Sequence, residues 1–241
     1  MQLVRLIIMS LCFAVFSYAK SFDLIQTKLE KVEDIYGYVQ DDPRILMHSS
    51  GIVVHSIENQ DSIIARVSVV GRENGLVKLQ FKVFDMLTQD AMPLPNVLPE
   101  IGDKVVLNYL YDRALIIAPD KKVYDYIAQK FSDLYFLHPD LFGAHMIQEY
   151  RQTPKRSDFR SFCSKNAVGL LVVALENKAE LVDCQDFEKL QEIEIPQAQG
   201  LQIPFYSRIS GYKSDIFSLN DEAIENYYIY YKNLISLTRE Q

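Results

Sequence analysis

The chain has 241 residues, of which 49% are hydrophobic and 24% are charged, and this composition can fill one or two folded cores. Such a composition excludes a disordered chain, a collagen-like rod and a coiled coil. The formal net charge is −7 and the isoelectric point is about 5.2. We therefore expect no nucleic-acid partner, because nucleic-acid-binding proteins present a basic surface to the phosphates.

Residues 1–19 have the three-part pattern of a secretory signal peptide. Arg5 precedes an apolar run from Leu6 to Phe16, and Ser17-Tyr18-Ala19 places small residues at the cleavage site. The run is shorter than the roughly 20 residues of a membrane-spanning helix. Cys12 lies in the middle of the run, which argues against a lipoprotein signal. We expect cleavage after Ala19, export to the periplasm or cell surface, and no transmembrane segment in the mature chain. A buried N-terminal helix is the alternative.

Two cysteines follow the signal, Cys163 and Cys184, and an even number in an oxidising compartment favours a disulfide. The segment between them predicts a hairpin with strands near 168–175 and 179–184, and a short helix around 157–164 would bring Cys163 back to it. Closing a loop of about 20 residues would contribute roughly 3 kcal/mol. Two buried free thiols are the alternative. The wide spacing argues against a redox-active C-x-x-C pair.

The first half of the chain is predicted to consist mainly of strands. Runs of apolar or alternating residues indicate strands at 22–33, 51–57, 62–70 and 76–84. The last two form the clearest hairpin, because one face of each is polar and Asn74-Gly75 ends the turn between them. A second hairpin is expected from 104–111 and 114–118. Several short strands with regular turns predict a small β-barrel-like domain over residues 20–119.

The pattern after residue 119 predicts a mixed α/β domain over residues 120–241. Asp120 is placed to cap a helix over 121–131, a short strand is expected at 134–137, and Pro139 suits the first turn of a helix to about Tyr150. A final helix is expected to begin after Asn220. Its apolar stripe comprises Ile224, Tyr227, Tyr228, Tyr231, Leu234 and Ile235. We interpret this stripe as packing on the domain, with a partner-binding helix as the alternative. The fold class is therefore α+β.

The sequence contains no pattern typical of an enzyme or of a cofactor-binding protein. His138 and His145 are seven residues apart, whereas a metal site prefers closer spacing on a helix and a third ligand. Motifs for a serine nucleophile, a zinc protease, a phosphate loop and a dinucleotide site do not occur. We expect a non-enzymatic protein without metal or cofactor. An unrecognised hydrolase is an alternative that would need an acid, a base and a nucleophile in one pocket.

Several motifs resemble, in order and spacing, the N-terminal domain of bacterial plasminogen-binding surface proteins. They include SIIARVSVV, FLHPDLFGAHM, SDFRSFCSKNAVGLLVVALENKAELVDC and IPFYSR, and the similarity covers roughly residues 22–208. The resemblance implies an exported protein of a Gram-negative bacterium that captures host plasminogen through lysines. The kringle domains of plasminogen hold a lysine ammonium between carboxylates and stack its stem on aromatic rings.

In that family, binding is attributed chiefly to a lysine-rich C-terminal region, whereas this sequence ends Thr238-Arg239-Glu240-Gln241. The resemblance therefore directs attention to internal lysines, and the candidates are Lys121, Lys122, Lys155, Lys213 and Lys232. Ordinary solvated lysines are the alternative interpretation of each. The alternative function is a periplasmic structural or envelope-assembly factor that contacts other envelope proteins and has no host ligand.

Overall fold

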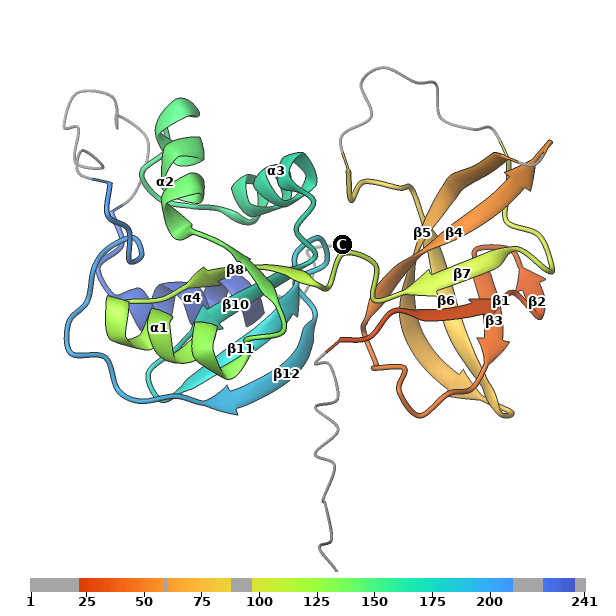
Figure 1. The fold of residues 1–241 in the computed structure, drawn as a ribbon, viewed down its shortest axis with the longest axis horizontal. Helices are drawn as coiled ribbons and strands as arrows, with labels where there is room; N and C mark the ends of the chain where they lie inside the picture. Colours follow the sequence, from red (N-terminus) through yellow and green to blue (C-terminus); the bar gives the residue numbers. More distant parts are fainter. Residues whose placement is uncertain (1–21, 59, 88–96, 210–222, 237–241) are drawn as a thin grey trace, which may run out of the picture.

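The computed structural model describes residues 22–58, 60–87, 97–209 and 223–236, which form two lobes that lie side by side (Figure 1). The first, here called the β lobe, is a seven-stranded antiparallel sheet with the order β1-β7-β4-β5-β6-β3-β2. Its strands are β1 (Ile25–Lys28), β2 (Lys31–Glu33), β3 (Tyr36–Gln40), β4 (Ser50–Ile57), β5 (Gln60–Glu73), β6 (Leu76–Lys82) and β7 (Lys104–Leu107).

The predicted hairpin of the β lobe is confirmed as β5 and β6, which pair from Arg66↔Lys82 to Glu73↔Leu76. Asn74 and Gly75 both have positive φ, at 53° and 76°, and these residue types adopt that conformation at low cost in two-residue turns. Alternate residues of the sheet face a buried aliphatic core that includes Val53, Val67 and Leu79. The period-two pattern of the sequence therefore follows from a sheet with one buried face.

The small barrel predicted for this region is instead a curled, open sheet. Its edges are β1 and β2, which follow each other in the chain but do not pair. The two residues between them direct their amides to different neighbours: Leu29 N donates to Asp103 O at 2.9 Å and Glu30 N to Tyr38 O at 2.8 Å. The chain thus crosses from one edge to the other within a few residues, and the two short edge strands form no ladder between them.

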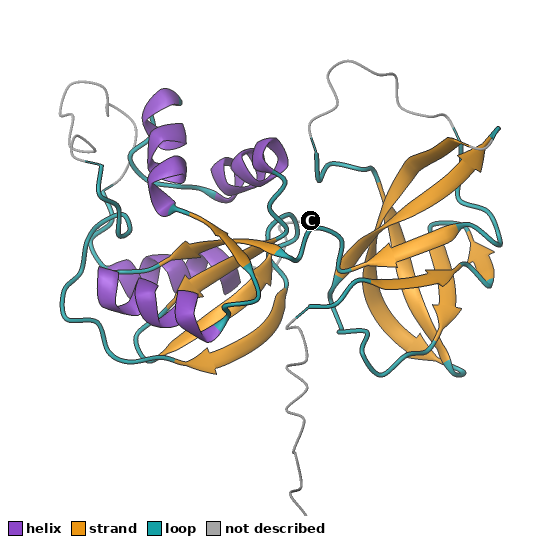
Figure 2. Cartoon of the chain, viewed as in Figure 1, coloured by secondary structure: helices purple, strands orange, loops and turns teal. Residues whose placement is uncertain are grey.

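The second lobe, here called the α/β lobe, is a five-stranded mixed sheet with helices on both faces (Figure 2). The strand order is β12-β11-β10-β8-β9, and β8 runs parallel to both β9 and β10. Its elements are β8 (Arg113–Ile117), α1 (Lys121–Lys130), β9 (Tyr135–Leu137), α2 (Pro139–Gln148), α3 (Arg156–Asn166), β10 (Leu170–Ala174), β11 (Lys178–Asp183), β12 (Lys189–Glu194) and α4 (Tyr227–Ser236).

The second predicted hairpin, 104–111 with 114–118, is wrong. Residues 104–107 form β7 of the β lobe, whereas residues 113–117 form β8 at the interior of the other sheet. Asn108 and Leu110 adopt positive φ, at 59° and 66°, where the chain passes between the sheets. The run from Ala114 to Ile117 is fully buried, as expected for a strand covered on both faces. The sequence pattern of β8 indicated a strand but not the sheet that it joins.

The helices divide between the two faces of the five-stranded sheet. Val123 and Ile127 of α1 pack with Ile116 on one face. The opposite face, with Leu115 and Ile117, is covered by α2, α3 and α4 through residues such as Phe142, Phe159 and Tyr227. The α/β lobe is therefore a three-layer structure. No helix of the described ranges has the length and apolar character to cross a bilayer.

The helix boundaries agree with the caps expected from the sequence, except at the last helix. Asp120 accepts a hydrogen bond from Val123 N at 2.8 Å and caps α1, as predicted. The final helix begins at Tyr227 and is capped by Asn226, which accepts from Ile229 N at 3.0 Å; the predicted cap, Asn220, lies outside the described residues. The predicted packing of its apolar stripe is confirmed, since Tyr227 and Tyr231 are fully buried.

Candidate functional site

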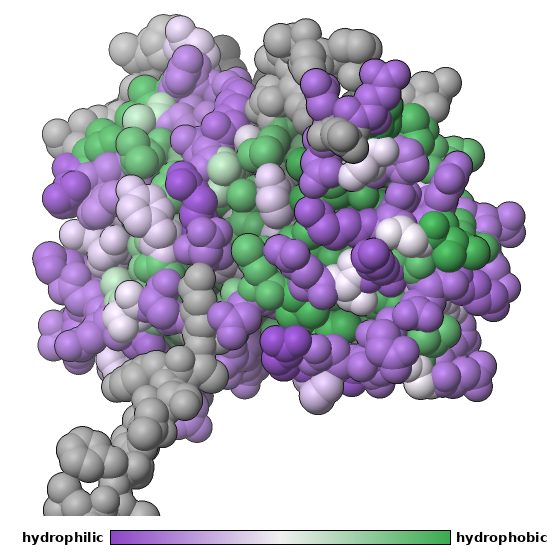
Figure 3. All heavy atoms as spheres, turned by 45° about the vertical axis from the view of Figure 1, so that its right-hand side comes forward, coloured by the Kyte–Doolittle hydropathy of each residue, from purple (hydrophilic) through white to green (hydrophobic). Residues whose placement is uncertain are grey.

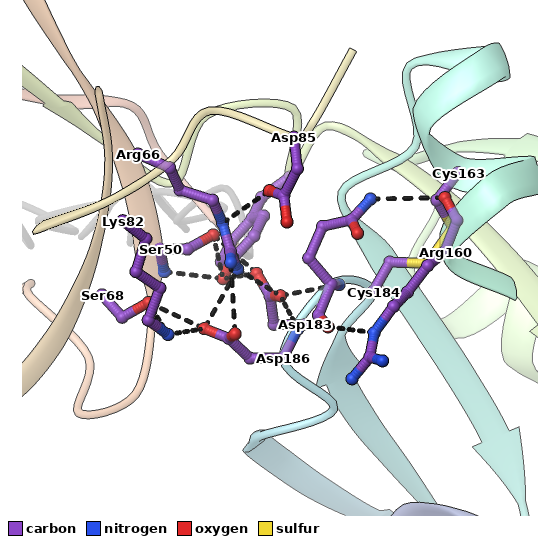
Figure 4. A network of polar contacts seen from close by, with 12 residues as sticks. Ser50, Arg66, Ser68, Lys82, Asp85, Arg160, Cys163, Asp183, Cys184 and Asp186 are labelled. Atoms are coloured by element: carbon purple, nitrogen blue, oxygen red, sulfur yellow. Dashed lines mark hydrogen bonds and ion pairs between the residues drawn. A yellow bond between two sulfur atoms is a disulfide. The ribbon is translucent and has the colours of Figure 1, made fainter. Parts of the chain in front are cut away.

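An extensive cluster of interacting polar side chains joins the two lobes (Figure 4). The β lobe contributes Ser50 of β4, Arg66 and Ser68 of β5 and Lys82 of β6, and the α/β lobe contributes Asp183 and Asp186 at the end of β11. Tyr111, on the segment that connects the lobes, completes what we call the interlobe network.

Asp183 is the centre of the interlobe network, and both of its carboxylate oxygens are fully engaged. Oδ1 accepts from Arg66 Nη2 at 2.9 Å and from the amides of Gln185 and Asp186 at 2.8 Å each. Oδ2 accepts from Ser50 Oγ at 2.6 Å and from the Tyr111 hydroxyl at 2.8 Å. A carboxylate has about four lone-pair sites, so these five donors leave no oxygen for a ligand.

Arg66 supplies the cation for this carboxylate and for a second one. Its side chain is only 2% exposed, and its Nη2 lies 3.0 Å from Asp186 Oδ2. Burial would lower the pKa of the Arg66 guanidinium, but the charges of Asp183 and Asp186 outweigh that effect and raise the pKa. Arg66 Nε has no hydrogen-bond partner among the described residues and lies 3.8 Å from Asp85 Oδ1. The cation is therefore held by ion pairs across the lobe boundary.

Asp186 extends the network along the β lobe. It accepts from Ser68 Oγ at 2.7 Å and from Lys82 Nζ at 2.8 Å. Burial would raise the pKa of this carboxyl, but the charge of Arg66 and then the contacts with Lys82 and Ser68 hold it well below its ordinary value. Burial, and to a smaller extent the charge of Asp183, raises the pKa of the Tyr111 phenol. Its hydroxyl therefore remains a hydrogen-bond donor at neutral pH.

The predicted disulfide is confirmed and anchors the turn that carries these carboxylates. Cys163 of α3 and Cys184 are bridged with a Cα–Cα distance of 6.5 Å, and Cys184 directly follows Asp183. A second tie lies beside the bridge, because Arg160 Nε donates to Gln185 O at 2.7 Å. The turn after β11 is thus fixed to α3 on one side and to the β lobe on the other.

The chemistry of the interlobe network is that of a structural contact between the lobes. Its carboxylates are saturated by donors. Ser68 Oγ accepts from Lys82 Nζ at 2.9 Å, but both groups also donate to Asp186 Oδ2, so the pair is engaged in the network. In the described parts of the chain, no group of three His, Cys, Asp or Glu side chains is arranged to hold a metal ion. His138 serves as the cap of α2, with Nδ1 accepting from Asp140 N at 3.1 Å. The network was not predicted from the sequence, because bonded members such as Ser50 and Asp183 are 133 residues apart.

The structure brings together only two of the lysines singled out from the sequence. Lys121 and Lys122 are exposed at the start of α1, on one face of the five-stranded sheet. Lys155 precedes α3 and Lys232 lies on α4, and these helices cover the opposite face. Lys213 lies outside the described residues. The candidates therefore do not form one patch.

The pair on α1 borders an open cleft of about 500 Å³. Asp125 and Tyr126 line the same cleft, and Lys121 Nζ lies 2.6 Å from Asp125 Oδ2. Lys122 has no carboxylate within 4 Å among the described residues, in contrast to most of the lysines in that part of the chain. Those with such a carboxylate include Lys31, Lys78, Lys82, Lys104, Lys165, Lys178 and Lys189.

Comparison with known proteins gives a consistent result. A family profile described as "Plasminogen-binding protein pgbA N-terminal" matches residues 24–235. Two curated relatives, from Helicobacter pylori strains J99 and 26695, are both named Plasminogen-binding protein PgbA. Each is 25% identical over 189 residues, which cover 77% of this chain and 41% of the relative. The chain thus spans about two fifths of the length of these relatives.

Proposed function

Because this chain belongs to the family of plasminogen-binding protein PgbA N-terminal domains, we propose that it is an exported, non-enzymatic module that captures plasminogen through exposed lysines. The family match confirms the resemblance inferred from the motifs. Export is supported by the signal-peptide pattern of residues 1–19. Plasminogen as the partner is supported by the names of both curated relatives.

The observation that carries the lysine part of the proposal is the geometry at the start of α1. A lysine-binding site must draw an ammonium out of water, which is easiest where no intramolecular ion pair has to be broken. Lys122 meets that condition, and its neighbour Lys121 has one exposed pair, with side chains 67% and 54% exposed. Asp125 places a carboxylate one turn along the helix. The surface therefore presents an ammonium and a carboxylate, the two charged groups of a C-terminal lysine.

The test is binding of the purified chain to immobilised plasminogen, with and without the lysine analogue 6-aminohexanoic acid. We expect binding that the analogue abolishes, and at least tenfold weaker binding by the variant Lys121→Ala/Lys122→Ala. The matched control is Lys178→Ala/Lys189→Ala, which removes two lysines that Glu192 already pairs at 2.8 and 2.5 Å. Absence of binding, insensitivity to the analogue, or equal binding by both double variants would overturn the proposal.

The distribution of lysines favours a second candidate, a periplasmic structural or envelope-assembly factor. The four candidate lysines that the structure describes lie on opposite faces of the α/β lobe, and several other lysines form ion pairs, as expected where lysines stabilise the fold. Protease treatment of intact cells separates the two candidates. A surface module is digested, whereas a periplasmic factor is protected until the outer membrane is opened.

A further inference from the structure

A second cleft, of about 270 Å³, lies in the β lobe at the ends of β1, β4 and β7. Its lining includes three basic side chains, Lys28, His55 and Lys104, and two acidic ones, Asp61 and Asp103. It belongs to a different lobe from the lysines of α1 and shares no residue with the interlobe network. Its volume is near the lower limit of ligand sites, which suits a small group.

The two acidic side chains of this cleft are already occupied by protein donors. Asp103, whose side chain is 8% exposed, accepts from Glu100 N at 2.8 Å and lies 2.7 Å from His55 Nδ1. Asp61 accepts from Ser56 Oγ at 2.6 Å and from Lys104 Nζ at 3.2 Å. Neither carboxylate needs a cation from outside, whereas the ammonium of Lys28 has no carboxylate within 4 Å among the described residues.

The strand register places this unpaired ammonium beside a second one. Lys28 of β1 stands directly opposite Lys104 of β7, and such facing positions bring side chains close together on one side of a sheet. Like charges in this position destabilise the pair. Asp61 compensates Lys104, but no described carboxylate lies within 4 Å of Lys28. An anion between the two ammonium groups would relieve the repulsion.

His55 adds a third polar group whose orientation is fixed. An ionised carboxylate only accepts hydrogen bonds, so Asp103 assigns the proton to Nδ1 and leaves Nε2 as the second ring nitrogen. In the imidazolium form Nε2 is a donor as well. A buried carboxylate behind an imidazole is the arrangement that holds such a ring in one orientation.

We propose that this cleft binds a small oxyanion, a phosphate or sulfate group, between Lys28 and Lys104 and beside His55. Lysine ammonium groups bind phosphate as point charges, without the geometric demands of arginine. The same phosphate chemistry is offered by a free anion and by the headgroup of an anionic phospholipid. Ile101, 69% exposed, is next to Gly102 at the cleft and would contact the remainder of a larger ligand.

The experiment titrates the full chain with inorganic phosphate at low ionic strength, followed by NMR at the amides of residues 54–56 and 102–104. A second arm measures co-sedimentation with phosphatidylglycerol vesicles against phosphatidylcholine vesicles. The variant is Lys28→Ala/Lys104→Ala, and the control is Lys178→Ala/Lys189→Ala, which has the same change in charge. Far-UV circular dichroism checks that each variant is folded, and Lys28→Gln replaces the double variant if it is not.

We expect saturable shifts at these amides, with at least tenfold weaker binding in the cleft variant and unchanged binding in the control. Binding of phosphatidylglycerol vesicles but not of free phosphate, lost in the same variant, supports the proposal with a lipid headgroup as the source. Equal binding by both double variants, or binding in neither arm, overturns it. Plasminogen binding is measured on the same proteins, so failure of one proposal leaves the other unaffected.

Discussion

Replacing Arg66 by methionine tests whether the interlobe network holds the two lobes together. The change keeps most of the side-chain volume but removes the cation between Asp183 and Asp186. Asp183 retains four donors, and Asp186 retains its contacts with Ser68 and Lys82 but loses the guanidinium. Two carboxylates with side chains 1% and 8% exposed would then share a boundary with one partly exposed ammonium.

The expected cost follows from this burial. Removing one partner of a buried ion pair typically destabilises a protein by about 3–5 kcal/mol, because the remaining charge is left without compensation. Asp186→Asn should cost less, about 1–3 kcal/mol, since Arg66 then still pairs with Asp183. The double variant should lose less than the sum of the single losses, because the two side chains contact each other.

Urea denaturation followed by far-UV circular dichroism measures these differences, as the chain has no tryptophan. The matched control is Arg44→Met, which breaks a pair with Asp42 on a side chain 64% exposed and should change stability by less than about 1 kcal/mol. If Arg66→Met lowered the free energy of unfolding no more than Arg44→Met, the network would not stabilise the contact between the lobes, and the reasoning would be refuted.

The pH dependence of this difference has a definite sign. The folded-state pKa of Asp186 is depressed, chiefly by Arg66 against the effect of burial. Its stabilising contribution is therefore complete above the unfolded-state pKa of about 3.9 and is lost as the pH falls through the lower folded-state value. We expect the stability gap between the natural protein and Arg66→Met to be constant from about pH 7 to pH 5 and to shrink below about pH 4.

Three further predictions use the same denaturation measurement. Cys163→Ala/Cys184→Ala should lower stability by about 2–4 kcal/mol, and equal midpoints for the oxidised and variant proteins would contradict a stabilising bridge. Gly51→Ala should be strongly destabilising, because its Cβ would lie 2.3 Å from Val106 O, whereas Gly200→Ala, with nothing within 4 Å, should have little effect. Asp120→Ala should cost about 1–2 kcal/mol, since its carboxylate caps α1 and accepts from Gln199 N at 2.6 Å.

The local elements of the fold could be predicted because each has a short-range cause. Asn74-Gly75 predicts a tight hairpin turn, Asp120 predicts the start of a helix, and Cys163 and Cys184 predict a bridge with each other because they are the two cysteines after residue 19. Assignment to a sheet has no such cause. The apolar run 114–117 satisfies the strand pattern equally well beside β7 or beside β10, and only the packing of the whole lobe selects β10.

The polar sites were beyond prediction for the same reason. Arg66 occupies a position in an alternating strand where a charged residue is normally solvated, and nothing nearby in sequence indicates that Asp183 will bury it. Lys28 and Lys104 become neighbours only through the pairing of β1 with β7. The exposed pair on α1 was identifiable because Lys121 and Lys122 are adjacent, and the helix that presents them is a local element.

The composition of the interlobe network indicates that it determines the relative position of the two lobes more than the free energy with which they associate. Replacing a complete buried ion cluster by apolar residues of similar size is often neutral or stabilising. Buried charges therefore stabilise a protein no more than apolar residues in the same place would. Nonpolar side chains such as Phe84 and Met86 are buried nearby and would tolerate small displacements of one surface over another. The directional hydrogen bonds that Arg66 and Ser50 of the β lobe donate to Asp183 do not tolerate such displacements, because a shift of the lobes leaves a buried donor or acceptor without its partner. The disulfide at Cys184 ties the same turn to α3, so the position of the Asp183 carboxylate is constrained within the α/β lobe as well as across the lobe boundary.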